Sequence, residues 1–314
     1  MTAAPPALAT VPASADTPFT ADDRFIAWRG RDFPCRVLHP LDTPASVPLL
    51  VLGGGLQDRR SWARLERRLG HRHPLVIPDL PPARTPRRAG DHSGGDHLGW
   101  DDLTDAALHA ADQTGPGHFA VLGVSSGYPV AYRLAQRHPE RLTHLLLFGA
   151  APRPGPRLRT LIHEGLAREA APGPGPHREA AGRLVDLLTN PRAGADRLMI
   201  RAAARMLRNQ LTASPRDPLA RYVADRGHLL LNDPLPAGGV TGVRALVGVG
   251  AHDSVTTVED NRAVAATIEH ATLAVMRDAD HLLHMERDAD FADLIGRFLH
   301  RRPLTTPGTL VTRP

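Results

Sequence analysis

The sequence of 314 residues contains one cysteine, Cys35, and no lysine. A single cysteine excludes a framework of internal disulfides and any metal site built from several cysteines. Without lysine, the chain cannot form a phosphate-binding loop of the Gly-Lys-Ser or Gly-Lys-Thr type. Aromatic residues make up 4% of the chain, so its core must be built from Leu, Val and Ala. No stretch approaches the roughly 20 apolar residues needed to span a bilayer, and we expect no membrane segment.

The charge is unbalanced toward arginine: the formal net charge is +5 and the sequence pI is about 10.4. Arg, Ala, Gly and Pro are abundant together, as in proteins from G+C-rich genomes, so the high pI partly reflects composition. The densest arginine run, over residues 59–72, has the spacing of a solvated helix face. No recognition motif or set of stacking aromatics accompanies it, which argues against nucleic-acid binding. The 17 histidines include no His-Glu-x-x-His pair, and we expect no metal site and no cofactor.

Short apolar runs alternate with helical patterns along most of the chain. Most runs are apolar throughout, which is typical of strands buried on both faces of a sheet. The alternation predicts an α/β fold with a mostly parallel sheet and helices on both faces. The predicted strands are residues 48–53, 74–79, 118–123, 144–149, 243–250 and 271–276. The predicted helices are residues 59–70, 97–113, 126–138, 257–269 and 285–301.

Three segments interrupt this alternation. Residues 1–19 are rich in Ala, Pro, Thr and Ser and lack the basic and apolar regions of a signal peptide, so we expect a disordered tail and a cytoplasmic protein. Residues 302–314 predict a second tail. Residues 152–236 contain no strand-like run but have apolar residues at helical spacing. They predict a helical lid inserted into a core formed by residues 20–151 and 237–301.

The most specific motif is Gly-Val-Ser-Ser-Gly at residues 123–127, a G-x-S-x-G. It follows a predicted strand and precedes a predicted helix, which is the context that the motif requires. Because the turn is tight, its flanking positions need glycine, and it holds the hydroxyl of Ser125 at the carboxyl end of the strand. The N-terminus of the next helix stabilises negative charge nearby. Ser125 is therefore the candidate nucleophile, and it needs a neighbouring base.

Ser125 and the residues after it resemble the α/β-hydrolase family, and the similarity covers about residues 24–300. The family order is Ser, then Asp or Glu, then His. Asp253 lies just after a predicted strand, where the family has its acid. His281 matches the histidine of the family's Gly-His ending, with Glu286 as the later glutamate. The resemblance thus implies a Ser125, Asp253 and His281 triad, while His284 is a rival base at the wrong spacing.

Residues 49–56 resemble the strand and loop that form the family's oxyanion hole. In that register Gly55 has the oxyanion position, and Gly53 stands where many members have histidine. The resemblance implies that the backbone N–H groups of Gly55 and Ser126 bind the developing alkoxide. Leu56 is the alternative donor if the loop shifts by one residue, and we expect it to contact substrate.

Two further residues depart from the family pattern. Tyr128 replaces a second glycine after the nucleophile, and we expect it to narrow the pocket or contact substrate. Asp79 ends the second predicted strand, but the glycines and the serine of the family's loop are missing after it. We interpret Asp79 as structural, since aspartates often brace turns by bonding their own backbone.

The motifs together predict a serine hydrolase that acts on an ester, thioester or lactone carbonyl through an acyl-enzyme. Two alternatives stay open. One is a cyclase, lyase or cofactor-free oxygenase in which His281 and Asp253 act as a general base on the substrate. The other is a catalytically idle small-molecule-binding protein. We expect a largely apolar small-molecule substrate, and the sequence also allows a homodimer.

Overall fold

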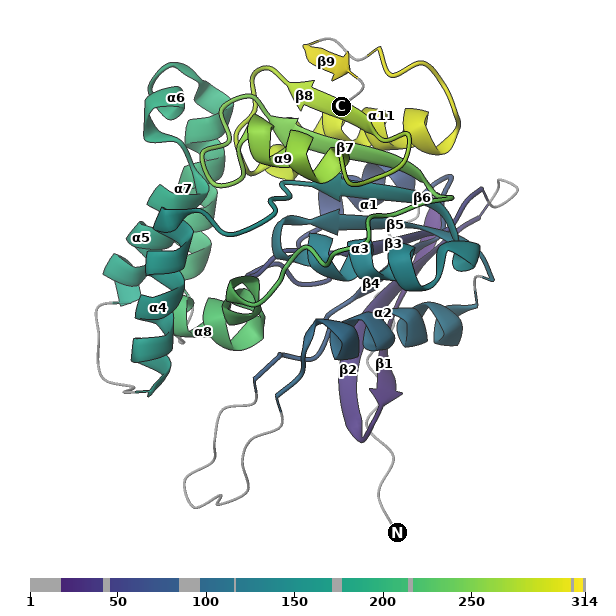
Figure 1. Cartoon of the computed structure of the whole chain (residues 1–314), viewed down its shortest axis with the longest axis horizontal. Helices are drawn as coiled ribbons and strands as arrows, with labels where there is room; N and C mark the ends of the chain where they lie inside the picture. The colour runs from purple at the N-terminus through teal and green to yellow at the C-terminus, as the bar shows by residue number, and fades with distance from the viewer. Residues whose placement is uncertain are drawn as a thin grey trace.

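A computed structural model describes residues 18–41, 46–84, 97–115, 117–170, 177–213, 217–305 and 308–312. A sheet of nine strands runs through the molecule in the order β1-β2-β4-β3-β5-β6-β7-β8-β9 (Figure 1). The six central strands from β4 to β8 pair in parallel, while β1, β2 and β9 add antiparallel pairs at the two edges. This confirms the predicted α/β fold with a mostly parallel sheet.

Each of the six predicted strands is present, and its residues are almost all buried because helices cover both faces of the sheet. They correspond to β3 (Leu49–Leu52), β4 (Leu75–Pro78), β5 (Phe119–Val124), β6 (Leu142–Phe148), β7 (Arg244–Gly250) and β8 (Thr272–Met276). The other three strands are β1 (Phe19–Trp28), β2 (Arg31–Pro40) and β9 (Thr309–Thr312).

Two apolar cores lie on opposite faces of the sheet. Helices α2 (Trp100–Thr114), α3 (Tyr128–Arg137) and α9 (Val258–Ala265) supply one core. Helices α1 (Ala63–Leu69) and α11 (Asp288–Leu299) supply the other, with short α10 (Leu283–Glu286) just before α11. The strand order reverses direction between β3 and β5, and in open α/β sheets the crevice at such a reversal is where ligands bind.

All five further helices lie between β6 and β7. They are α4 (Pro156–Ala170), α5 (His177–Leu188), α6 (Pro191–Asp196), α7 (Leu198–Thr212) and α8 (Pro218–Asp225), followed by the 3-10 turn η3 (Gly227–Leu231). We call this segment the insertion. It packs beside the carboxyl ends of the parallel strands, at the left in Figure 1. None of its described residues forms a named strand, as the sequence predicts for residues 152–236.

The structure corrects the predicted ends of the core. Residues 309–312 are not part of a tail, because β9 pairs with β8. Phe19 is a buried strand residue rather than the end of a tail, and residues 1–17 lie outside the described part of the chain. The hairpin of β1 and β2 lies outside the six strands predicted above. No helix of the described residues combines the length and apolarity needed to cross a membrane.

Candidate active site

The turn after β5 presents Ser125 in a left-handed backbone conformation, with φ of 49°. The chain passes directly from the strand into the 3-10 turn η1 (Ser125–Gly127) and then into α3. A Cβ atom on Gly127 would overlap the backbone oxygen of Leu52, and one on Gly123 would lie 2.7 Å from the Cβ atom of Ala131. Both glycines are therefore required for the turn to fit between β3 and α3.

Three side chains from three loops form one hydrogen-bonded line. His281 Nε2 lies 3.0 Å from Ser125 Oγ, and His281 Nδ1 lies 2.9 Å from Asp253 Oδ2. Asp253 follows β7 and is fixed by the backbone N–H groups of Val255 and Thr256, each 2.9 Å from its Oδ1 atom. The arrangement matches the geometry needed for a base that activates a serine and is itself held by an acid.

Acidic groups surround His281. Burial alone would lower the pKa of its imidazole, but Asp253, Asp280 and Glu286 together raise it. Burial also raises the pKa of Asp280 to about 6 and that of Glu286 to about 7. Glu286 accepts hydrogen bonds from the backbone N–H groups of Asp280 and Leu282. It thereby fixes the loop that carries His281.

Asp280 also ties the insertion to this loop. Its carboxylate accepts a hydrogen bond from the backbone N–H of Asn190, which lies between α5 and α6. The side-chain amide of Asn190 in turn donates to the carbonyl of His252, 3.1 Å away. The insertion is therefore held next to both Asp253 and His281.

The glycine loop after β3 faces Ser125. The N–H of Gly55 donates to the hydroxyl of Ser126 over 2.6 Å. A Cβ atom on Gly55 would lie 2.5 Å from the ring of Tyr222, which belongs to α8. Glycine is thus needed at position 55 because the loop lies between the turn at Ser125 and the insertion.

Gln57 supports this loop, in which Gly53 stands where many relatives have histidine. The Oε1 atom of Gln57 accepts from the N–H of Gly54 at 2.6 Å, and its Nε2 atom lies 2.8 Å from His284 Nε2. Burial lowers the pKa of His284 to about 3, so its neutral ring can accept this bond. From the insertion, Arg226 donates to the carbonyl of Gly53 over 3.2 Å.

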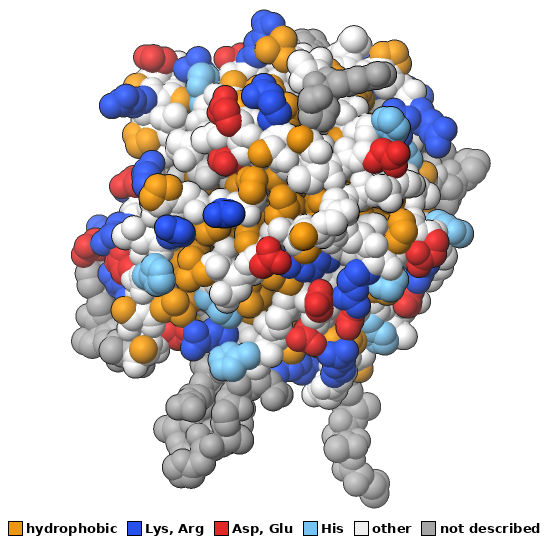
Figure 2. Space-filling model, viewed as in Figure 1, with side chains coloured by type: hydrophobic (Ala, Val, Ile, Leu, Met, Phe, Trp, Pro, Cys, Tyr) orange, Lys and Arg blue, Asp and Glu red, His pale blue; other side chains and the backbone are white. Residues whose placement is uncertain are grey.

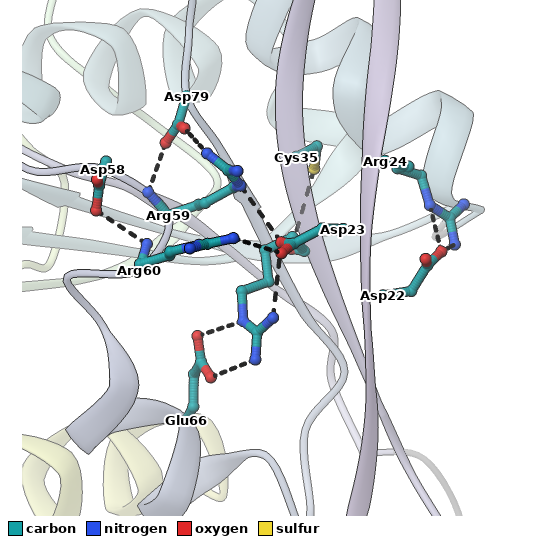
Figure 3. Close-up of polar contacts among 10 residues, drawn as sticks. Asp22, Asp23, Arg24, Cys35, Asp58, Arg59, Arg60, Glu66 and Asp79 are labelled. Carbon is teal, nitrogen blue, oxygen red and sulfur yellow. Dashed lines mark hydrogen bonds and ion pairs between the residues drawn. The ribbon is translucent and has the colours of Figure 1, made fainter. Parts of the chain in front are cut away.

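A charged network anchors the far end of the same loop (Figure 3). Asp79 accepts from the backbone N–H and the guanidinium of Arg59, each at 2.5 Å. Arg59 also contacts Asp23, which is buried among three arginines. Asp79 is structural, as the sequence analysis proposes, but it braces the loop after Gln57 rather than its own turn.

A cavity of about 420 Å³ opens at Ser125 and His281. The residues that line it come from the glycine loop after β3, α1, the insertion and the loop that carries His281. Its apolar lining residues are Leu56, Val124, Leu188, Met206, Leu207, Leu282 and Met285, and its polar ones include Gln57, Asp58, Arg60, Ser61, Arg64 and Gln210.

The comparison with known families decides the class of the protein. A family model described as the alpha/beta hydrolase family matches residues 49–294. The chain belongs to the alpha/beta hydrolase family. It is therefore an alpha/beta hydrolase enzyme.

Similar proteins include a 2-hydroxymuconate semialdehyde hydrolase from Pseudomonas sp. (strain CF600), 28% identical over 269 residues that cover 82% of this chain and 88% of the relative. A thermophilic esterase from Thermogutta terrifontis has a similar structure, with a TM-score of 0.67 and 22% identity over 91% of this chain and 100% of that one. The enol-lactonase from Burkholderia xenovorans LB400 has a TM-score of 0.66 and 21% identity over 88% of this chain and 100% of that one. These structural likenesses show a shared fold.

The two residues of this alpha/beta hydrolase that were expected to contact substrate, Leu56 and Tyr128, lie in different surroundings. Leu56, with φ of 76°, lines the cavity. Tyr128 does not line it: its ring is buried and its hydroxyl donates to the carbonyl of Ala151. The expectation that Tyr128 contacts substrate is thus not supported, because the first turn of α3 directs this side chain into the core. From the insertion, Met206 lines the cavity, whereas Met199 does not.

Several residues around the site could not be identified from the sequence. Asn190, Tyr222 and Arg226 lie in the insertion, where the sequence shows helical spacing but no motif. Gln57 directly follows the glycine loop in sequence. Its amide, which can both donate and accept hydrogen bonds, was the one feature that could have indicated a supporting role there. Among the described residues, no group of three or more His, Cys, Asp and Glu side chains could hold a metal ion.

Proposed function

We propose that this enzyme is a serine hydrolase that cleaves an ester, thioester or lactone through an acyl-enzyme. The observation that carries the proposal is the line from Ser125 Oγ through His281 to Asp253, with contacts of 3.0 and 2.9 Å at a strand-to-helix turn. A base-only mechanism needs His281 and Asp253 but has no need of a serine held in the left-handed conformation.

In this mechanism His281 takes the proton of Ser125 as its oxygen attacks the carbonyl carbon. The C–O or C–S bond to the leaving group then breaks, and His281 returns the proton to that group. Water attacks the acyl-enzyme by the same route and releases the acid and free Ser125. Asp253 keeps the imidazole oriented and stabilises its cation during both steps.

The oxyanion would be bound by the N–H groups of Gly55 and Ser126. In the structure the N–H of Gly55 donates to the hydroxyl of Ser126, so a bound oxyanion would replace this hydroxyl as the acceptor. Gln57 and Arg226 hold the loop that carries Gly55, which keeps the N–H in place before substrate arrives.

The insertion would serve as the lid and supply part of the substrate walls. Leu188 and Leu207 of the insertion line the cavity together with Leu56 and Leu282 of the core, which suits a compact, largely apolar acyl group. A cavity of about 420 Å³ lies within the range of small-molecule sites. The names of the relatives, an esterase and an enol-lactonase, are consistent with ester or lactone substrates.

Two variants and one inhibitor test the proposal. Ser125→Ala should lower the turnover of a small chromogenic ester by about three orders of magnitude or more, because the nucleophile is lost. His281→Ala should lower it similarly. A serine-directed phosphonate should add once, at Ser125, and Ser126→Ala should still be labelled.

A different result would support the base-only alternative. If Ser125→Ala keeps turnover of the substrate close to that of the wild type while His281→Ala loses most of it, the acyl-enzyme proposal is wrong. Failure of the phosphonate to label the protein in its active form would contradict it independently.

A further inference from the structure

A second hollow lies where the insertion joins the core. Its volume is about 1000 Å³, and it is separate from the cavity at Ser125 because the two share no lining residue. Residues 152–163 at the start of the insertion form one wall, and residues 230–235 at its end form the other. We call it the junction groove. Figure 2 shows apolar side chains gathered over this junction, with arginine and histidine side chains around them.

The groove carries positive charge that the fold does not use. Arg153, Arg159 and His163 line it and are exposed. None of these three side chains has an ion pair or hydrogen bond with the described part of the chain. Glu164, which follows His163 on α4, binds Arg168 and Arg183 instead.

One carboxylate, Asp233, also lines the groove, so the two arginines outnumber it. The groove includes Pro156, the first residue of α4. The partial positive charge of a helix N-terminus adds to that of the arginines there. The local potential therefore favours an anion.

The remaining walls are mainly apolar. They consist of Thr160, whose hydroxyl donates to the carbonyl of Pro156, and of leucines and prolines: Pro152, Pro154, Pro156, Leu230, Leu231, Pro234 and Leu235. Leu230 is buried, whereas Leu231 and Leu235 are half-buried. Covering such side chains with hydrocarbon is favourable by roughly 25 cal/mol per Å² of apolar surface. A free inorganic anion would leave this surface exposed.

We propose that the junction groove is a second binding site, for a small amphipathic carboxylate. Its alkyl chain would lie on the leucines and prolines, and its carboxylate would lie between Arg153 and Arg159. An arginine binds a carboxylate through two parallel N–H donors, and unpaired guanidinium groups are available for this contact. The volume of the groove accommodates a chain of about ten carbons.

The place of the groove links it to the catalytic residues. The first wall continues from Ala151, whose carbonyl accepts the hydroxyl of Tyr128 next to the turn at Ser125. The second wall follows Arg226, which binds the carbonyl of Gly53 in the glycine loop after β3. A ligand in the groove would therefore contact both segments that connect the insertion to the core.

Calorimetric titration with decanoate tests the proposal on the full-length protein. We expect saturable binding that survives phosphonate labelling of Ser125, because the two cavities are separate. Decan-1-ol, which has the same chain without the charge, should bind at least tenfold more weakly. The Arg153→Gln/Arg159→Gln variant should lose at least tenfold in affinity for decanoate.

The matched control is Arg192→Gln/Arg205→Gln, which removes the same charge from exposed positions outside the groove; its affinity should equal that of the wild type. Equal losses in both double variants, or no loss in the first, would overturn the proposal. So would binding that disappears when Ser125 is labelled. If the phosphonate fails to react, the serine mechanism is in question, and the arginine variants still decide the groove.

Discussion

His281 is the side chain on which the proposed mechanism depends most. In that mechanism it must be neutral to take the proton of Ser125, yet three carboxyl groups near it favour its cation. The carboxylate of Asp280 stands where the family has a glycine without a side chain. The loop therefore adds charge beside the base, and at the same time it uses that carboxylate to hold Asn190.

The pH profile should report this charge. The proposed mechanism needs neutral His281, so kcat/KM should fall as the pH drops through its pKa, which the surrounding carboxylates raise. Asp280→Asn removes one of these charges and should move the acid limb to lower pH. Asp278→Asn removes an exposed charge from the same loop and should move it much less. Equal shifts in the two variants would show that Asp280 has no special influence on His281.

Cys35 illustrates a residue whose inertness follows from its position. It is fully buried in β2, and burial raises the pKa of its thiol to about 12. Because the thiolate is the reactive form, iodoacetamide at pH 8 should leave native Cys35 unmodified and activity unchanged. Mass spectrometry should find full alkylation only after unfolding. Rapid stoichiometric labelling of the active enzyme would contradict this.

The meeting of Ser125, Asp253 and His281 could be predicted from the sequence, while their catalytic roles stay a prediction. Each of the three follows a buried strand, and parallel strands bring such positions to one edge of the sheet. Sequence reasoning failed at Tyr128, because proximity to Ser125 in sequence does not determine which way a helical side chain points. It also could not find Asn190 or Arg226, whose partners lie 90 and 173 positions away in the chain.

Among the elements, the turn between β5 and α3 has the tightest packing requirements. Gly127 passes against the end of β3, where a side chain would overlap the carbonyl oxygen of Leu52. The backbone of β3 cannot move away without disturbing its pairing with β5 and the loop that carries Gly55. The glycine is therefore part of the site although it has no side chain.

Gly127→Ala tests this requirement. We expect a loss of more than about 3 kcal/mol in the free energy of unfolding, together with loss of activity, because backbone atoms must shift. Gly155→Ala adds a methyl group where no atom lies within 4 Å and should change stability by less than about 1 kcal/mol. Urea unfolding measures both. A Gly127→Ala variant as stable as the wild type would show that the turn can relax.

Among the strands of the sheet, the inner ones could be predicted from the sequence better than the edge strands. The strands β3 to β8 are almost uniformly apolar because helices cover both faces, and this pattern is easily recognised. The hairpin of β1 and β2 carries polar residues such as Asp22 and Arg24 on its open side. The strand β9 follows a proline-containing segment that resembles a tail. The edge strands lack a continuous run of apolar residues. They are held in the sheet by pairing, β2 with β4 and β9 with β8.

Across the whole molecule, buried histidines make stability depend on pH. Burial lowers the pKa values of His73 and His144 to about 4 and that of His284 to about 3. The unfolded chain binds protons on these groups below about pH 6.5, while the folded chain does not. Their contribution is thus present above pH 6.5 and is lost as the pH falls toward 4. The raised pKa values of Asp280 and Glu286 act in the opposite direction.

His144→Gln should isolate one of these contributions. His144 packs against Phe298 with its Nε2 atom buried and without a partner in the described structure. Between pH 7.5 and pH 5, the wild type should lose about 2 kcal/mol more stability than the variant. His270→Gln, at an exposed position, should keep the slope of the wild type. Urea unfolding at the two pH values gives the comparison, and parallel slopes for all three proteins would contradict it.

Because Ser125 has a left-handed backbone conformation, selection for stability and selection for turnover favour different residues at this position. A residue with a side chain is held at φ of 49°, a conformation that glycine adopts at no steric expense. Ser125→Gly should therefore relieve the backbone strain of the turn, but the substitution also removes the proposed nucleophile. Directed evolution for heat resistance alone would favour this change and yield a sturdier but inactive protein. Only a screen that scores turnover in every round would keep the serine.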